Sequence, residues 1–527
     1  MSKQDRSDDG GAPLFERPLD RRAFLGLSAA GGAAFLLAAC GGDEEEAVAP
    51  PAAAEPAPPA PPAAEPAEPP PAEPPAITGN TPAERAIAGI KALNLPPDFT
   101  ITVFTEDLSI LGPEVTKAKF EQESGIKLDV QKAPYLEYAA KVFNDATTKA
   151  GTFDVILMET NRLGDLDNAG YLTDVTDWVE KYDPDLEEMV PPVGRVSSIY
   201  NGKYVGIPTD GDVFIFYYRK DLLEDPSEQE AFKAKYGRDL AVPLTYDEYN
   251  EVLEFFTRPD EGLFGAVEWR IKGVNYWWFW QRLWSGGGTY FNDDGSAAIN
   301  SEAGIKALED MKAMSAYMPK DALSYGYVET VEAMTSGAAF SNITWPAAGK
   351  NVNDPATSKT AGKWGYAVVP GYVVNGAPNP KSMAAPGYTI IVSNSSKKDK
   401  EACYLYSQWY TSAENLIEAN KNLKGNTDVI RESIFTDPAM TGLFPGADLY
   451  LEAQKANLAV AVPDPVMPGY GEYTQALEIE ISNVLTGSKS AKEALDTAAK
   501  KWDEITDAFG RENQLQVWQN FLATYNG

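Results

Sequence analysis

The chain has 527 residues and a mass of 57.2 kDa, so two or more compact units are expected. Its 77 acidic and 45 basic residues give a formal charge of −32, which argues against nucleic acid or an anionic membrane surface as a partner. The sequence contains no histidine, which excludes Ser-His-Asp and Cys-His catalytic sites, a histidine general base and His-ligated metal sites.

Residues 1–40 have the features of an export signal. Arg21 and Arg22 precede an apolar run of small residues that ends at Cys40, in LDRRAFLGLSAAGGAAFLLAAC. The run is short and rich in glycine for a transmembrane helix. It resembles a twin-arginine lipoprotein signal, which implies cleavage before Cys40 and lipidation of its thiol. We therefore expect an exported protein, lipid-anchored to the cell membrane and facing the periplasm or the cell exterior.

Residues 41–82 consist mainly of proline, alanine and glutamate. This composition cannot bury a core, and its prolines favour extended conformations of about 3.1 Å per residue. The segment is predicted to be a disordered tether. The second cysteine, Cys403, lies in a helical pattern and is expected to be a buried apolar residue.

From about residue 98 the sequence predicts an α/β unit with a largely parallel sheet. Buried-strand patterns alternate with helical ones, at 99–106, 113–125, 126–133, 135–151 and 153–160. Ligands bind at the carboxyl ends of strands in such sheets. The polar residues expected at that edge are Thr105, Glu106, Glu159, Thr160, Asn161 and Arg162.

A second α/β stretch follows over residues 209–340. Asp210 and Asp212 precede the strand pattern VFIFYY, and a turn between two strands would also explain them. Thr245 and Glu248 have the spacing of a capping box at the start of a helix over 243–258.

Four tryptophans occur in VNYWWFWQRLWSGGGTYF, residues 274–291. Most of these aromatic residues are expected to fill a core. Because Trp277, Trp278, Trp280 and Trp284 cannot share one helical face, at least one is expected to face a cleft. An indole in a polar cleft can stack on the apolar face of a sugar or a polyol.

Several segments resemble the maltose-type (family 1) solute-binding proteins of bacterial ABC importers. They occur in the family's order from about residue 98 to near the C-terminus, and they are FDVILMETNRLGDLDNAGYLTDVTDW, YNGKYVGIPTDGDVFIFYYRKDLL, WSGGGTYFNDDGSAAINSEAGIKALEDM, SGAAFSNITWPAAG and SNSSKKDKEACYLYSQWYTSAENLI. Each segment alone is a weak signal, and five in order are a strong one.

The resemblance implies a two-lobed periplasmic-binding-protein fold of type II. Each lobe would be a mostly parallel sheet flanked by helices, with the cleft between the lobes. Lobe 1 would comprise residues 98–209 plus 371–437, and lobe 2 residues 212–370 plus 440–527. The chain would cross between lobes near 208–213, 370–385 and 435–445.

The resemblance also implies a set of cleft residues, to which the strand ends add Thr105 and Glu106. Those implied by position in the family are Asn161, Arg162, Asp210, Asp212, Trp277, Trp278 or Trp280, Trp345, Gly387, Tyr388, and Tyr470 or Tyr473.

The implied function is the substrate-binding component of an ABC importer, which closes on a sugar, oligosaccharide or polyol and delivers it to a membrane permease. We expect a monomer that does no chemistry on its ligand and needs no catalytic residue, cofactor or metal.

Alternative functions remain at this point. An exported glycoside hydrolase also works with paired carboxylates and needs no histidine. A cation receptor using Tyr217 and Tyr218 is less favoured, because neighbouring strand residues point to opposite faces. The segment NDDGS, residues 292–296, lacks the spacing of a calcium loop and is expected to be a turn.

Overall fold

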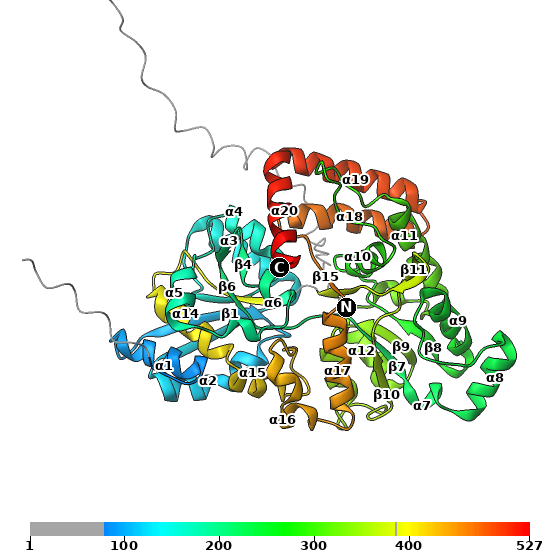
Figure 1. Ribbon diagram of the computed structural model, residues 1–527, viewed down its shortest axis with the longest axis horizontal. Helices are drawn as coiled ribbons and strands as arrows, with labels where there is room; N and C mark the ends of the chain where they lie inside the picture. The colour runs from blue at the N-terminus through cyan, green and yellow to red at the C-terminus, as the bar shows by residue number, and fades with distance from the viewer. Residues whose placement is uncertain (1–77, 385–386, 527) are drawn as a thin grey trace, which may run out of the picture. The chain divides into compact units, whose positions relative to one another are not determined.

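The computed structural model describes residues 78–384 and 387–526 (Figure 1). The predicted export signal with Cys40, and residues 41–77 of the predicted tether, lie outside these residues. Within the described ranges, none of the helices combines the length and the apolar character that crossing a bilayer requires.

The first lobe is built on a five-stranded sheet, at the left of Figure 1. Its strands, in spatial order, are β2 (Lys127–Ala133), β1 (Thr100–Glu106), β3 (Val155–Glu159), β14 (Tyr388–Val392) and β6 (Gly206–Pro208). The predicted alternation of strands and helices is confirmed by α2 (Leu111–Ser124) between β1 and β2 and by α3 (Tyr135–Thr148) between β2 and β3. The remaining helices of this lobe are α1 (Pro82–Ala92), α4 (Leu163–Asn168), α5 (Thr176–Tyr182), α6 (Val193–Val196), α14 (Lys400–Tyr410) and α15 (Ala413–Asn420).

The folded part of the chain begins earlier than residue 98. Helix α1 starts at Pro82, and the Thr81 side chain caps it by accepting a hydrogen bond from the Glu84 N–H. The helix packs against α2, α5 and α14. Gln408 in α14 donates to the Pro82 carbonyl oxygen at 3.0 Å. Cys403 in the same helix is fully buried, as predicted.

The second lobe is built on a four-stranded sheet. Its strands, in spatial order, are β10 (Trp364–Ala367), β7 (Ile215–Arg219), β9 (Ala339–Thr344) and β8 (Phe264–Val267). In each sheet one strand opposes the rest, β14 in the first and β7 in the second. Strands β14 and β7 each come directly after the chain has passed from the other lobe. Helices connect the strands that run in the same direction. The two-lobed α/β fold is therefore confirmed, with sheets in which every strand but one runs in the same direction.

The helices around the second sheet include the one that carries the four tryptophans. They are α7 (Lys220–Leu223), α8 (Pro226–Tyr236), α9 (Tyr246–Phe256), α10 (Tyr276–Ser285), α11 (Glu302–Met314), α12 (Tyr327–Ser336), α13 (Ala347–Val352), α17 (Ala447–Leu458), α18 (Tyr470–Leu485), α19 (Ala491–Ala508) and α20 (Arg511–Asn526). The predicted capping box of Thr245 and Glu248 is present at the start of α9.

The tryptophans of α10 do not face a cleft. Trp277, Trp278 and Trp280 are at most 1% exposed, and Trp284 is half-buried. The expectation that one of them faces out is wrong, because α11, α18 and the strand β13 (Ser382–Ala384) pack around this helix.

Over residues 78–526, the segments that the structure describes pass between the lobes three times. The first passage, residues 209–214, joins β6 to β7, and the second joins β13 to β14. The third lies between the short helix η7 (Glu432–Thr436) and α17, and it includes α16 (Pro438–Thr441).

One predicted lobe boundary differs from the structure. The resemblance places residues 371–384 in the first lobe, but they lie against the second. Strands β11 (Tyr372–Val374) and β12 (Ala377–Asn379) form a hairpin, and the Tyr372 N–H donates to Ser285 Oγ at 2.8 Å. Strand β13 pairs with β15 (Ala461–Pro463). The return to the first lobe therefore comes after residue 384.

Candidate ligand-binding site

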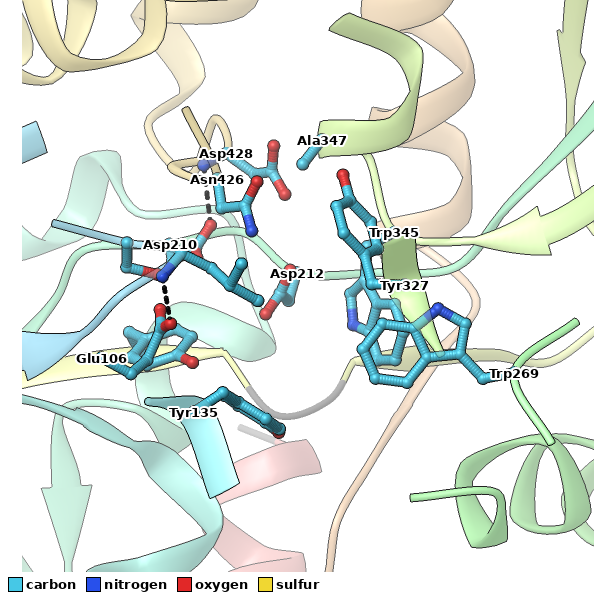
Figure 2. A pocket seen from close by; sticks show the side chains of 13 residues that line it. Glu106, Tyr135, Asp210, Asp212, Trp269, Tyr327, Trp345, Ala347, Asn426 and Asp428 are labelled. Atoms are coloured by element: carbon cyan, nitrogen blue, oxygen red, sulfur yellow. Dashed lines mark hydrogen bonds between the residues drawn. The ribbon is translucent and has the colours of Figure 1, made fainter. Parts of the chain in front are cut away.

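A pocket lies where the two lobes and their connections meet (Figure 2). Its cavity volume is about 50 Å³, well below the range for small-molecule sites. The first lobe and the connections supply Glu106, Leu108, Ser109, Tyr135, Asp210, Asp212, Tyr388, Asn426 and Asp428, and the second lobe supplies Trp269, Tyr327, Trp345 and Ala347.

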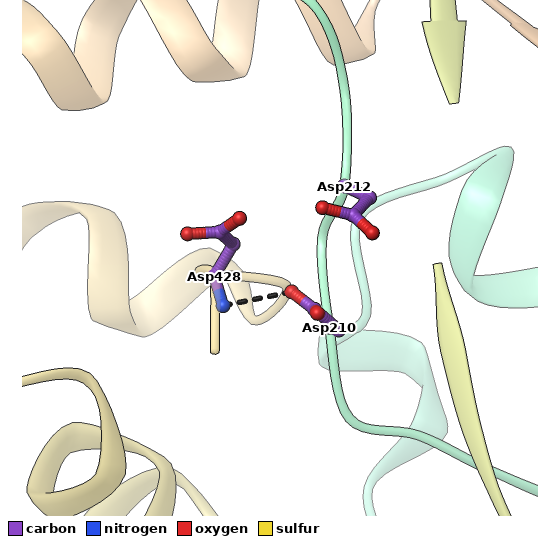
Figure 3. A group of neighbouring side chains, drawn as sticks. All are labelled: Asp210, Asp212 and Asp428. Atoms are coloured by element: carbon purple, nitrogen blue, oxygen red, sulfur yellow. Dashed lines mark hydrogen bonds between the residues drawn. The ribbon is translucent and has the colours of Figure 1, made fainter. Parts of the chain in front are cut away.

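Three aspartates from two separate segments converge in this pocket (Figure 3). Asp210 and Asp212 lie on the first passage between lobes, and Asp428 lies on the segment leading to the third. A carboxylate oxygen from each lies within 4.8 Å of the other two. Gly211 allows this approach, because a Cβ there would lie only 2.0 Å from the Val429 carbonyl oxygen.

Backbone N–H groups hold two of these carboxylates in place. Asp210 Oδ1 accepts from the Asp428 N–H at 2.7 Å, and Asp212 Oδ2 accepts from the Gly387 N–H at 3.3 Å. Both oxygens of Asp428 lack a hydrogen-bond partner among the described residues, as does Oε1 of Glu106.

Burial raises the pKa of every carboxyl group in the pocket. Burial raises the pKa of Glu106 to about 7. For Asp210 and Asp212, burial and then the charges of the neighbouring aspartates hold the pKa well above its usual value. The pKa of Asp428 rises only to about 6, because the Lys350 ammonium opposes the effect of burial.

Lys350 is the one buried cation beside the aspartates within the described part of the chain. Its Nζ donates to the Thr427 carbonyl oxygen at 2.6 Å and lies 3.7 Å from Asp428 Oδ1. Burial lowers the pKa of Lys350, and the charge of Asp428 opposes that change. One ammonium therefore stands beside several carboxyl groups.

Two indole rings form the wall opposite the acids (Figure 2). The ring centroids of Trp269 and Trp345 are 4.8 Å apart. Trp277 and Trp278 meet the Trp345 ring edge-on at 5.3 and 5.4 Å, and Tyr217 donates its hydroxyl to the Trp345 carbonyl oxygen at 3.0 Å. The tryptophans of α10 therefore support the pocket wall from behind.

A second polar cluster joins the lobes beside the pocket. Asn161 Nδ2, from the first lobe, donates to Asp464 Oδ2 at 2.6 Å and to the Tyr470 hydroxyl at 3.0 Å, both in the second lobe. Trp277 Nε1 donates to Asp464 at 3.1 Å, and the Arg162 guanidinium lies 5.0 Å from the Tyr470 ring centroid. These contacts connect the two lobes directly.

The structure divides the predicted site residues into three groups. Glu106, Asp210, Asp212, Trp345 and Tyr388 line the pocket. Thr105 and Gly387 lie next to the pocket, and the buried Oγ1 of Thr105 lacks a hydrogen-bond partner among the described residues. The polar cluster contains Asn161, Arg162, Trp277 and Tyr470. The structure does not bring Trp278, Trp280 or Tyr473 into either group, because their rings are buried in the core of the second lobe.

Sequence reasoning missed several lining residues, notably Tyr135, Trp269, Tyr327 and Asp428. Tyr135 and Trp269 follow the carboxyl ends of β2 and β8, so the strand-end rule, applied to every strand, would have found them. Asp428 lies in a loop remote in sequence from Asp210, and a single sequence carries no signal for that contact.

The rival features identified in the sequence have structural roles. Tyr217 is buried and bonds backbone carbonyl oxygens, and residues 292–296 form a turn in which Asp294 accepts from the Ser296 N–H. The three aspartates have oxygen ligands suited to a divalent cation, but the Lys350 ammonium beside Asp428 opposes one.

The family comparison matches most of the folded chain. A family model described as bacterial extracellular solute-binding protein matches residues 104–417. Among curated relatives, a probable amino-acid ABC transporter periplasmic-binding protein of Sinorhizobium fredii is 27% identical over 352 residues, which cover 65% of this chain and 75% of the relative. A lactose-binding protein of Rhizobium radiobacter is 26% identical over 202 residues, 38% of this chain and 44% of that protein.

Solved structures of ABC transporter solute-binding proteins share the fold. One from Agrobacterium radiobacter, in complex with ribitol, has a TM-score of 0.67 and 26% identity, covering 78% of this chain and all of the other. One from Agrobacterium vitis, with bound D-mannitol, has a TM-score of 0.63 and 19% identity, covering 78% of this chain and 99% of the other. At 19% identity, the similarity to the Agrobacterium vitis protein shows a shared fold and nothing more.

Proposed function

Because the chain belongs to the bacterial extracellular solute-binding proteins, we propose that it captures a sugar or polyol between its lobes and delivers it unaltered to an ABC permease. The observation that carries this proposal is one pocket in which two indoles face carboxyl groups. Indole faces suit the C–H surface of a hydroxyl-rich ligand, and carboxylates accept hydrogen bonds from its hydroxyls.

The arrangement of the lining residues supports capture by lobe closure. A ligand in this pocket would contact Glu106 and Tyr388 of the first lobe and Trp269 and Trp345 of the second. Such a ligand stabilises the closed state by the free energy of the contacts that are absent when the lobes separate. Thin connections between the lobes allow that rotation.

The position of the acids favours binding over hydrolysis. Figure 2 shows Glu106, Asp210 and Asp428 on the same side of the pocket, with the indoles opposite. A glycosidase places its two carboxyl groups on opposite sides of the scissile bond. We infer that the ligand leaves the site chemically unchanged.

Isothermal titration calorimetry with ribitol, mannitol, maltose and lactose tests the ligand class. Binding of at least one is expected, and a ligand at a hundred times its Kd should stabilise the protein by about 2.7 kcal/mol. Trp345→Ala should abolish the binding, while Trp178→Phe, in α5 and outside the pocket lining, should retain it. Recovering the ligand by chromatography after incubation checks that it is intact. A protein that binds none of these compounds, or that cleaves one, would refute the proposal.

We also propose that the exported protein is a monomer held at the membrane by a lipid on Cys40. Support comes from the sequence of residues 19–40 and from the extracellular character of the family. Labelling cells with a radioactive fatty acid should mark the wild-type protein and not Cys40→Ala. Equal labelling of both would contradict the anchor.

A further inference from the structure

The pocket contains more acidic groups than a neutral ligand needs. Glu106, Asp210, Asp212 and Asp428 all line it, and each is at most 6% exposed. No lysine or arginine occurs among the described residues of its lining. The nearby Lys350 pairs with Asp428, which leaves more carboxyl groups than cations in a water-poor space.

Hydrogen bonding within the protein leaves part of this acidic surface unused. Oε1 of Glu106 has no hydrogen-bond partner among the described residues, and the Asp428 carboxylate has no close one, with the Lys350 ammonium 3.7 Å from Oδ1 and the Ala347 N–H facing it, although both acids are almost fully buried. Burial raises the pKa of these carboxyl groups, so they hold protons more readily than exposed acids do, and a bound cation would favour their ionised forms. An ionised carboxylate in a low-dielectric site is costly unless a positive charge lies beside it.

The aromatic wall suits a cation as well as a sugar. Trp269, Trp345, Tyr327, Tyr135 and Tyr388 surround the same space. A ligand ammonium within about 6 Å of an aromatic centroid is attracted by the ring, and tryptophan is the strongest partner. An organic cation can therefore contact the acids with its N–H groups and the rings with its carbon atoms.

A bare metal ion fits this wall less well. Calcium takes about 6–8 oxygen ligands, whereas much of the lining is aromatic carbon and the Lys350 ammonium adjoins Asp428. An alkylammonium group needs only a few acceptors and gains from the rings.

We propose that the physiological ligand is an aminated sugar or polyol whose protonated amine binds among Asp210, Asp212 and Asp428. This inference rests on the proposed function for the hydroxyl-rich part of the ligand and adds the amine to it. The aspartates would bind the ammonium, and the indole wall would hold the carbon chain.

A matched ligand pair tests the amine. D-Sorbitol and 1-amino-1-deoxy-D-sorbitol differ in one hydroxyl replaced by an amine that is protonated at pH 7. Titration calorimetry should give an affinity about 10- to 100-fold higher for the amine, the gain expected when a charged hydrogen bond replaces a neutral one. Equal or tighter binding of sorbitol would overturn the inference and leave the proposed function intact.

Variants of the acids test the location. Asp428→Asn and Asp212→Asn should each weaken binding of the amine by about 10-fold or more, and the loss for the amine should exceed the loss for sorbitol. Asp448→Asn removes one charge from an exposed position and should change neither affinity. Equal losses for both ligands would overturn the inference.

Other outcomes separate the two proposals. If putrescine binds and none of the hydroxyl-rich compounds does, the result would support the ammonium site and refute the carbohydrate assignment. Stabilisation by calcium chloride alone, with no response to either sorbitol compound, would refute the ammonium site.

Discussion

Single residues in the pocket make the stability of the unliganded protein dependent on pH. Glu106 is fully buried at the end of β1, and its pKa rises from 4.5 to about 7, mainly because of burial. The folded state therefore keeps a proton that the unfolded state loses between these values. This contribution to stability is complete below pH 4.5 and is lost as the pH rises through 7.

Glu106→Gln removes this titration while nearly preserving shape. We expect the free energy of unfolding of the wild type to fall between pH 5 and pH 8, and Glu106→Gln to reduce that fall by up to about 3 kcal/mol. Urea unfolding at several pH values measures the difference. Glu254→Gln, on the exposed surface, should keep the wild-type dependence. Parallel curves for Glu106→Gln and the wild type would contradict the assignment.

At the scale of elements, the acidic cluster depends on two connections that approach very closely. Gln454 Nε2, from α17, donates to the carbonyl oxygens of both Gly211 and Val429 at 3.1 Å. This bridge fixes the first passage against the segment that carries Asp428. The pocket geometry is therefore set by backbone packing as much as by the acidic side chains.

Gly211→Ala should disturb this approach. The added Cβ would lie 2.0 Å from the Val429 carbonyl oxygen, so the two segments must separate. Overpacking of this kind lowers stability by about 1–3 kcal/mol, and ligand affinity should fall with it. Denaturant unfolding and calorimetry measure both effects.

Gly326→Ala is the matched control for stability. Its Cβ would meet its nearest atom at 3.4 Å, an ordinary contact, and its free energy of unfolding should stay within about 0.5 kcal/mol of the wild type. A Gly211→Ala protein as stable as this control would show that the segments separate at no cost.

The sequence predicts local elements well and contacts between distant elements poorly. Strand patterns and the capping box at Thr245 depend on neighbouring residues, and the structure confirms them. The prediction that a tryptophan of α10 faces a cleft is wrong, because helical periodicity shows where side chains point but not which faces other elements cover. Asp210 was recognised from its place on a passage between lobes, whereas Asp428 joins it only through the tertiary fold.

For the whole molecule, the polar cluster between the lobes stabilises their contact. Asn161 donates to Asp464 and to Tyr470 across the lobes, and Asp165 of α4 accepts from the Gly469 N–H at 2.6 Å. Near the C-terminus, Arg195 Nε donates to the Thr524 carbonyl oxygen at 3.0 Å. Hydrogen bonds that exist only when the lobes meet favour the closed state by their own free energy.

Asn161→Ala should shift the unliganded protein toward separated lobes. The variant loses one neutral hydrogen bond and one hydrogen bond to a carboxylate, together about 2–4 kcal/mol. This is enough to change the ratio of closed to open molecules at least 10-fold. Small-angle scattering should show a larger radius of gyration without ligand, and calorimetry should show weaker binding.

Asn300→Ala separates this effect from the simple loss of a hydrogen bond. Asn300 donates to Asp496 Oδ1 at 2.9 Å, and both residues belong to the second lobe. Its removal takes away an Asn–Asp contact of the same kind without touching the lobe interface, so the scattering curve and the ligand affinity should match those of the wild type. If Asn161→Ala behaves like Asn300→Ala in both measurements, the cluster does not govern lobe closure.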